Sequence, residues 1–143
     1  MANLLERFST KVGIVGGPIT LAHSKNSITT KATDIVLASY LGSGGSALFY
    51  QIKADREVDE VPAGNMAVHR HLLEKSGGFN EKLGYNEDSY LCYTVRKEDY
   101  RIIYAAKARI LHFIGIDSYA DFISYFRRYG FERGKTAQAV LNL

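Results

Sequence analysis

The sequence predicts one α/β domain in which a mixed sheet is flanked by helices. The chain has 143 residues, of which 46% are hydrophobic, which suffices for one compact core but not for two independent ones. Short apolar runs typical of strands alternate with segments whose apolar residues recur at helical spacing. Turn-forming glycines separate these segments, as at residues 77–78. We therefore treat residues 1–143 as a single domain.

The N-terminal part contains one predicted strand and one predicted helix. Residues 4–8 have partial helical spacing, and residues 12–15 form a short apolar run that ends at the turn-forming residues 16–18. Residues 28–40 predict a helix, which Gly42 closes. The expected buried face of this helix consists of Ala32, Ile35, Val36, Ser39 and Tyr40.

The middle of the chain predicts short extended segments and a short helix. An apolar run at residues 47–52 indicates a strand. A charged turn at residues 55–60 follows, with a second extended piece through Val58 and Val61. Residues 69–75 predict a short helix, which the glycine pair 77–78 ends.

The C-terminal part alternates helices with strands. Asn86 is expected to cap a helix over residues 87–98. The expected buried face of that helix contains Leu91, Cys92 and Val95. Residues 101–104 and 108–113 predict strands, and a long helix begins near Ser118. The apolar stripe expected on this last helix consists of Tyr119, Phe122, Ile123 and Phe126.

Composition excludes several classes of function. The 18 basic and 15 acidic residues are spread along the chain, which argues against a dedicated nucleic-acid-binding protein. Cys92 is the single cysteine, so an internal disulfide framework is excluded and the chain suits a reducing compartment. The longest apolar stretch, near residues 35–41, is too short to span a membrane, and residues 1–9 carry charge where a signal peptide would be apolar. We therefore expect a cytoplasmic protein.

Glu87 and Asp88 are the strongest candidates for chemistry. They occupy the first turn of a predicted helix, where unpaired backbone N–H groups and the helix dipole favour an ionised carboxylate. Such a carboxylate, facing a cleft, can take a proton from an attacking hydroxyl group. The alternative is that both residues only stabilise the helix end.

The order of several motifs resembles the second half of family 2 glycosyltransferases, which have the GT-A fold. The matching segments are Val61-Pro-Ala-Gly-Asn-Met-Ala-Val-His-Arg70, Gly77-Gly-Phe-Asn80, Asn86-Glu-Asp88, Tyr100-Arg-Ile-Ile-Tyr104 and Ala108-Arg-Ile-Leu-His112. They lie in the family's order between residues 61 and 112, and the strand at residues 12–18 is similar to the element that usually precedes them. The resemblance implies an inverting sugar transfer from a nucleotide-sugar donor to an acceptor hydroxyl group.

The resemblance also implies roles for individual residues. Asp88 is similar to the family's catalytic base, with Glu87 as its acidic neighbour. Gly64 and Asn65 resemble the loop that faces the donor sugar and the acceptor. His112 matches a position that ligates the divalent metal, Mn²⁺ or Mg²⁺, on the donor diphosphate. Residues 77–78 would form a sharp turn whose neighbour Phe79 is anchored in the core, although an ordinary helix stop is an alternative for these glycines.

The resemblance is incomplete on the donor side. The family holds its metal with an Asp-x-Asp pair on an earlier strand, and this sequence contains no Asp-x-Asp. The nucleotide-binding strand and helix are also not found, so we expect the N-terminal donor-binding half to be missing from this chain and the isolated chain to be inactive. Metal binding is then expected only with the donor half present, as a partner subunit or in a longer chain. A homo-oligomer is a further expectation.

The last helix carries a basic group that could bind substrate. Arg128 is the candidate in this group, because Arg128-Tyr129 resembles part of the Gln-x-x-Arg-Trp motif of polymer-making members, although Tyr125 replaces the glutamine. Together with Arg127, Arg133 and Lys135 it could contact a diphosphate or an anionic membrane surface peripherally. The alternative is a solvated helix face.

Two other patterns have ordinary explanations. Gly130-Phe-Glu-Arg-Gly134-Lys135-Thr136 has the wrong glycine spacing for a phosphate-binding loop. Cys92 lies on the apolar side of its helix and is interpreted as a core residue, not a nucleophile. Apart from the enzyme, a non-catalytic binding or assembly module that retains the acceptor-side scaffold stays open.

Overall fold

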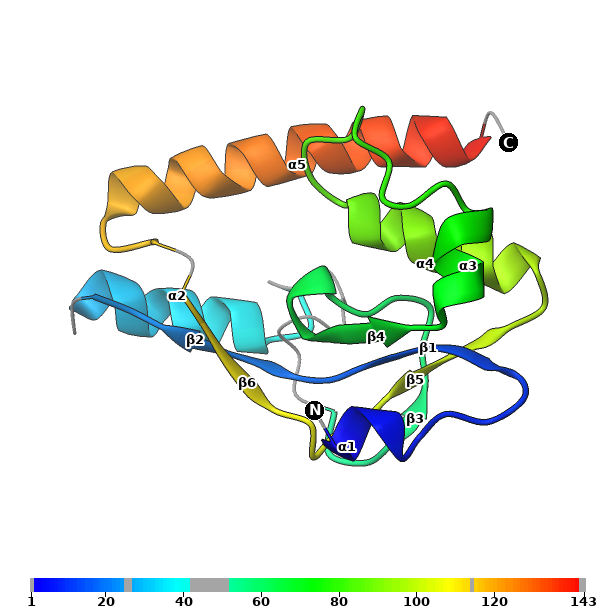
Figure 1. Ribbon diagram of the computed structural model, residues 1–143. Coiled ribbons are helices and arrows are strands. Elements are labelled where there is room, and N and C mark those ends of the chain that lie inside the picture. Colours follow the sequence, from blue (N-terminus) through cyan, green and yellow to red (C-terminus); the bar gives the residue numbers. More distant parts are fainter. Residues whose placement is uncertain (1, 25–26, 42–51, 114, 142–143) are drawn as a thin grey trace.

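The computed structural model describes residues 2–24, 27–41, 52–113 and 115–141 (Figure 1). The described part is an α/β structure with a mixed sheet and flanking helices, which confirms the predicted fold class at that level. Most of the strand expected at residues 47–52, and Gly42, lie outside the described residues.

The main sheet has four strands in the order β3-β5-β1-β4. The central strand β1 (Val12–Gly16) pairs in parallel with β5 (Arg101–Tyr104) and antiparallel with β4 (Met66–Val68), and β3 (Arg56–Glu57) pairs antiparallel with β5. All five residues of β1 are buried, because layers of side chains cover both faces of the sheet.

A second sheet contains two strands. In it, β2 (Ile19–Ala22) pairs in parallel with β6 (Ile110–Phe113). Figure 1 shows this ribbon continuing from β1 past the four-stranded sheet. Gly17 lies where the two sheets meet, and a Cβ atom there would lie 2.4 Å from the carbonyl oxygen of Ala108, so only glycine allows this close approach.

Helices cover both faces of the main sheet. On one face, α3 (Arg70–Lys75) and α4 (Glu87–Lys97) enclose a core in which Ile14 and Ile102 are fully buried. On the other face, α1 (Ala2–Leu5) contributes Leu4 to a smaller cluster. As predicted, the buried residues of α4 are Leu91, Cys92 and Val95.

Two helices complete the described structure. Helix α2 (Ile28–Ala38) begins with a capping box formed by Ser27 and Thr30, and α5 (Tyr119–Leu141) is the long C-terminal helix. Figure 1 shows α4 beneath the C-terminal half of α5, whereas the first turns of α5 extend past α4. None of the helices in the described ranges is both long and apolar enough to cross a membrane.

The predicted buried face of α2 is wrong. The buried residues of α2 are Thr30, Thr33 and Leu37, whereas Ile35 is 73% exposed. The two threonines can be buried because their hydroxyl groups donate to the helix backbone, Thr30 to the oxygen of Ser27 and Thr33 to that of Thr29, each at 2.9 Å.

The predicted apolar stripe of α5 is only partly buried. Tyr119 is 72% exposed and Ile123 is 48% exposed, and both lie in the first two turns of α5. Phe122 and Phe126 are half-buried and pack on each other with ring centroids 4.6 Å apart.

The turn at Gly77 and Gly78 has the predicted sharp geometry. Both glycines have positive φ angles, 78° and 82°. Phe79, however, is 40% exposed, so the expectation that it anchors the turn in the core is wrong.

Asp99, after α4, has a φ of 62°, a left-handed conformation that aspartate tolerates.

The charged segment 55–60 is more ordered than the expected solvated turn. It contains β3, and the Val58 N–H donates to the Ile102 oxygen at 3.0 Å. Asp55 pairs with Arg7 and accepts a hydrogen bond from the Ala106 N–H at 2.9 Å. Strands β2 and β4 were not predicted from the sequence.

Candidate functional site

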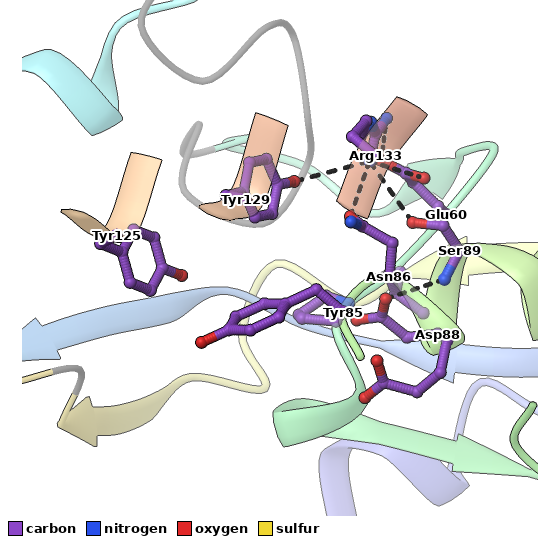
Figure 2. A pocket seen from close by; sticks show the side chains of 11 residues that line it. Glu60, Tyr85, Asn86, Asp88, Ser89, Tyr125, Tyr129 and Arg133 are labelled. Atoms are coloured by element: carbon purple, nitrogen blue, oxygen red, sulfur yellow. Dashed lines mark hydrogen bonds and ion pairs between the residues drawn. The ribbon is translucent and has the colours of Figure 1, made fainter. Parts of the chain in front are cut away.

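A pocket of about 130 Å³ lies between the start of α4, the segment before it and one face of α5. Residues 60–62 and 85–89 form two of its sides. Tyr125, Tyr129 and Arg133 of α5 form the third (Figure 2). Of the residues predicted for the site, Asp88 and Glu87 line this pocket.

Asp88 is a half-buried carboxylate fixed by two backbone donors. Its Oδ2 accepts a hydrogen bond from the Ala63 N–H at 3.0 Å, and its Oδ1 accepts one from the Ser89 N–H at 2.8 Å. The bond to Ser89 resembles a helix-end stabilisation, whereas the bond to Ala63 joins α4 to η1 (Ala63–Asn65), a single 3₁₀ turn. Asp88 therefore lines the pocket and also stabilises the turn beside it.

Burial raises the pKa of Asp88 above its ordinary value, although the hydrogen bonds from Ala63 and Ser89 act in the opposite direction. The negative charges of Glu87 and Glu60 raise this pKa further. The sequence had suggested that the helix end would favour the ionised form; in the structure, desolvation has the larger effect on this pKa. A carboxylate with a raised pKa is a stronger proton acceptor once ionised.

Gly64 and His112 lie next to each other. Gly64 is exposed in the η1 turn, one residue after the Ala63 N–H that Asp88 binds. A Cβ atom on Gly64 would lie 3.8 Å from Nδ1 of His112, which is exposed on β6. The structure therefore brings the predicted loop glycine, the predicted metal ligand and the segment bound by Asp88 to one side of the fold.

Asn65 has a different place from the one expected. Its side chain is buried, and its Nδ2 donates to the carbonyl oxygens of Pro18, at 3.1 Å, and of Ala108. The amide thus ties η1 to the junction between the two sheets. We assign Asn65 a positioning role in place of the expected contact with substrate.

Arg128 lies behind the pocket wall. Its guanidinium carbon is 4.7 Å from the centroid of the Tyr85 ring, and Tyr85 lines the pocket. Arg128 itself is exposed and is not among the lining residues. It can support Tyr85, and it reaches a ligand only if that ligand extends beyond the pocket.

Arg133, for which the sequence left open both an anion contact and a solvated helix face, lies at the pocket rim. Its Nη2 donates to Oε1 of Glu60 at 3.0 Å, and its Nη1 lies 3.4 Å from Oδ1 of Asn86, 3.4 Å from Oγ of Ser89 and 3.5 Å from the Tyr129 hydroxyl (Figure 2). Glu60, which was expected to be solvated, is therefore part of the site. The four-residue spacing of Tyr125, Tyr129 and Arg133 is the sequence signal that could have identified this face of α5.

Asn86 occupies the predicted cap position but does not cap the helix with its side chain. Its φ of 64° is left-handed, whereas a side-chain cap requires extended backbone. The side chain points toward Arg133 instead.

The described residues contain no group of three or more histidine, cysteine, aspartate and glutamate side chains that could hold a metal ion. His112 alone does not form such a site. We therefore derive no chemical step through a metal from these residues.

Cys92, the single cysteine, is buried, and burial raises its pKa to about 12, which fits the predicted core role.

A larger hollow of about 330 Å³ lies between α3 and α4, where Leu72, Tyr90 and Thr94 contribute to its walls. None of the six predicted site residues, all of which are described, lines it. Of these two hollows, only the pocket at Asp88 is lined by predicted site residues.

Comparisons with known proteins give no significant match of this chain to a protein-family model, a curated protein or a solved structure. The functional argument therefore rests on the residues and on the geometry of the site.

Proposed function

We propose that this chain is the acceptor-side part of an inverting glycosyltransferase with a GT-A-like fold, in which Asp88 is the general base. The observation that carries the proposal is the Asp88 carboxylate, which lines a pocket next to the η1 turn and has a raised pKa. The order of the motifs between residues 61 and 112 supports the same assignment.

The proposed reaction is a single displacement. Asp88 accepts the proton of an acceptor hydroxyl group, and the oxygen of that group attacks the anomeric carbon of the donor sugar. The bond from that carbon to the nucleoside diphosphate breaks, and the diphosphate leaves with the bonding electrons. Attack from the face opposite the leaving group inverts the configuration at the anomeric carbon.

Other residues have supporting roles in this proposal. The Ala63 N–H orients the base, and Asn65 fixes the turn that contains Gly64. The negative charge of Glu87 raises the pKa of Asp88, which makes the Asp88 carboxylate a stronger proton acceptor. Gly64 lies beside His112, one residue after the Ala63 N–H that binds Asp88, and in this proposal the donor sugar approaches from that side.

The donor side is part of the same proposal. A nucleotide-sugar, with Mn²⁺ or Mg²⁺ on its diphosphate and His112 as one ligand, would bind only together with a donor-binding half in the same protein or in a partner subunit. A cytoplasmic location and peripheral contact with a membrane surface remain proposals of the same kind.

The test is an assay of the natural gene product with a panel of nucleotide-sugars, Mn²⁺ and candidate acceptors, together with the variants Asp88→Asn and Glu81→Gln. Asp88→Asn keeps the shape of the side chain but cannot accept the proton, so we expect transfer to fall by about 10²-fold or more. Glu81→Gln is the matched control, because Glu81 is exposed and lines neither hollow.

Release of the nucleoside diphosphate and the configuration of the product are the two readouts. Near-normal turnover of a folded Asp88→Asn variant would end the assignment of the base. Retained configuration in the product would exclude the single displacement.

A further inference from the structure

The side-chain amide of Asn86 is buried and incompletely paired. Asn86 is only 6% exposed, and Nη1 of Arg133 lies 3.4 Å from its Oδ1. Because arginine can only donate, the amide oxygen must face Arg133, and this fixes the orientation of the amide. The NH₂ group is then buried without a hydrogen-bond partner among the described residues.

An unpaired buried NH₂ group is unfavourable, because it has lost its hydrogen bonds to water. Asn86 lines the pocket, so a ligand there could supply the missing acceptor. A ligand that bound only Asn86 would need only hydrogen-bond acceptors. The pocket also contains hydrogen-bond acceptors of the protein, so a ligand that fits it must carry hydrogen-bond donors as well.

Carboxylates lie on the same side of the pocket as Asn86. Asp88 and Glu87 both line it, and an ionised carboxylate can only accept hydrogen bonds. A ligand that pairs with both Asn86 and Asp88 must therefore accept at one point and donate at a neighbouring one. Adjacent hydroxyl groups meet this requirement, because each hydroxyl group donates and accepts.

Three tyrosines also line the pocket, Tyr85 from the segment before α4 and Tyr125 and Tyr129 from α5 (Figure 2). The rings of Tyr125 and Tyr129 are nearly parallel, with an interplanar angle of 8° and centroids 6.2 Å apart. The Tyr85 ring stands at 87° to that of Tyr125, with centroids 6.3 Å apart. The tyrosines therefore form an aromatic corner whose ring faces favour the slightly positive C–H groups of a flat, saturated ring.

The size of the pocket limits the ligand. Its volume of about 130 Å³ is well below the roughly 300 Å³ at which pockets for drug-sized ligands begin. The pocket can take one small ring, and the rest of a larger acceptor would extend past Tyr85 toward Arg128.

We propose that the acceptor is a saccharide whose terminal ring binds in this pocket, with its C–H face against the tyrosines and neighbouring hydroxyl groups paired with Asn86 and Asp88. This inference rests on the proposed transferase function, because it names the acceptor of the same site. It goes beyond that function in choosing a saccharide over a lipid or a protein side chain.

The test is a titration of the 143-residue chain with the methyl glycosides of glucose, galactose, mannose and N-acetylglucosamine, followed by NMR. We expect at least one glycoside to shift the Asn86 side-chain NH₂ resonances and the ring resonances of Tyr125 and Tyr129. Glycerol, which has adjacent hydroxyl groups but no ring, should cause no comparable shift at the same concentration.

Two variants make the test specific. Asn86→Asp keeps the left-handed backbone and the oxygen that faces Arg133 but replaces the buried donor with an acceptor, so affinity should fall about tenfold or more, which is about 1.4 kcal/mol. Tyr125→Ala removes the centre of the aromatic corner and should also weaken binding. Tyr119→Ala is the matched control on the same helix, because Tyr119 is 72% exposed and lies outside the pocket.

The outcomes separate this inference from the proposed function. If no glycoside binds, or if binding is insensitive to both Asn86→Asp and Tyr125→Ala in folded protein, the saccharide acceptor is wrong even if the natural gene product transfers sugar to a lipid or a peptide. If a glycoside binds as described but no nucleotide-sugar supports transfer, the binding site stands and the transferase function fails. The shift of the Asn86 resonances in the unmodified chain does not depend on the folding of any variant.

Discussion

Arg133 of α5 and Glu60 of the segment before η1 form an ion pair of 3.0 Å between Nη2 and Oε1, which joins the last helix to the rim of the pocket that Asp88 lines. The side chain of Glu60 is 22% exposed and that of Arg133 is 44% exposed, so solvent screens this pair only in part. Loss of Arg133 should therefore loosen the contact of α5 with the pocket.

We expect Arg133→Gln to lower the free energy of unfolding by about 1 kcal/mol, near the upper end of the range for partly exposed ion pairs. Arg127→Gln, at an exposed position of the same helix, is the control and should change it by less than about 0.5 kcal/mol. Urea denaturation measures both values. A double-mutant cycle with Glu60→Gln that gave no coupling energy would show that the pair contributes nothing.

The raised pKa of Asp88 predicts a pH dependence of stability with a definite sign. Because the folded-state pKa lies above the ordinary value of 3.8, the folded protein binds this proton more tightly than the unfolded chain does. The corresponding stability is fully present below the unfolded-state pKa and is lost as the pH rises through the folded-state pKa.

Asp88→Asn removes this titration. The free energy of unfolding of the wild type, minus that of Asp88→Asn, should therefore fall as the pH is raised from about 3 and become constant above the folded-state pKa. Urea denaturation of both proteins across this range checks the sign. A difference that instead grew with pH would mean that the two N–H donors, and not burial, dominate.

Substitution by alanine should have opposite effects on stability at Gly77 and at Gly130. Gly77 has a φ of 78°, and a Cβ atom there would have no neighbouring atom within 4 Å, so Gly77→Ala should cost about 1–2 kcal/mol through backbone strain alone. Gly130 lies within α5, where a Cβ atom would also meet nothing within 4 Å, so Gly130→Ala should stabilise the protein by about 0.5–1 kcal/mol. Thermal unfolding of the two variants should move in opposite directions, and equal shifts would contradict the helical assignment of Gly130.

Cys92 should be unreactive in the folded protein. Burial raises its pKa to about 12, and its Sγ lies against the carbonyl oxygen of Val61 at 3.9 Å. Alkylation by iodoacetamide near pH 8 should therefore be more than about 100-fold slower in the native protein than in urea, because the thiolate is scarce and enclosed. Mass spectrometry measures both rates, and fast native alkylation would disprove the core assignment.

Substitution of Asn65 should reduce the stability of the protein, because its side chain has a structural role and does not contact the ligand directly. Its Nδ2 satisfies the carbonyl oxygens of Pro18 and Ala108, so Asn65→Ala should destabilise the protein by about 1–3 kcal/mol. Asn65→Asp should cost more, because it would place a carboxylate against two carbonyl oxygens. If instead Asn65→Ala left thermal stability unchanged but abolished glycoside binding, the residue would be a direct ligand contact.

The sequence predicted the elements whose patterns are local and strong. Helix α4 was predicted with its three buried residues, because Leu91, Cys92 and Val95 repeat at helical spacing. Strands β1 and β5 were predicted because each is a compact apolar run between turn signals. For α2 the sequence predicted the wrong face, because apolar spacing favoured Ile35 and Val36, whereas tertiary packing buries the threonine-containing face.

Within the site, the sequence by itself determined the acidic pair at the start of α4, whereas the proximity of Gly64 to His112 is seen only in the structure. Only the tertiary structure decided the pKa direction of Asp88, since burial is a property of the surrounding chain and not of a helix end. It also decided that Arg133 and Glu60, 73 positions apart, meet, and that the side chain of Asn86 lies against Arg133. The physical reason is the range of the interactions: spacing encodes contacts within a helix turn, whereas desolvation and pairing between distant segments arise only when α5 packs over the start of α4.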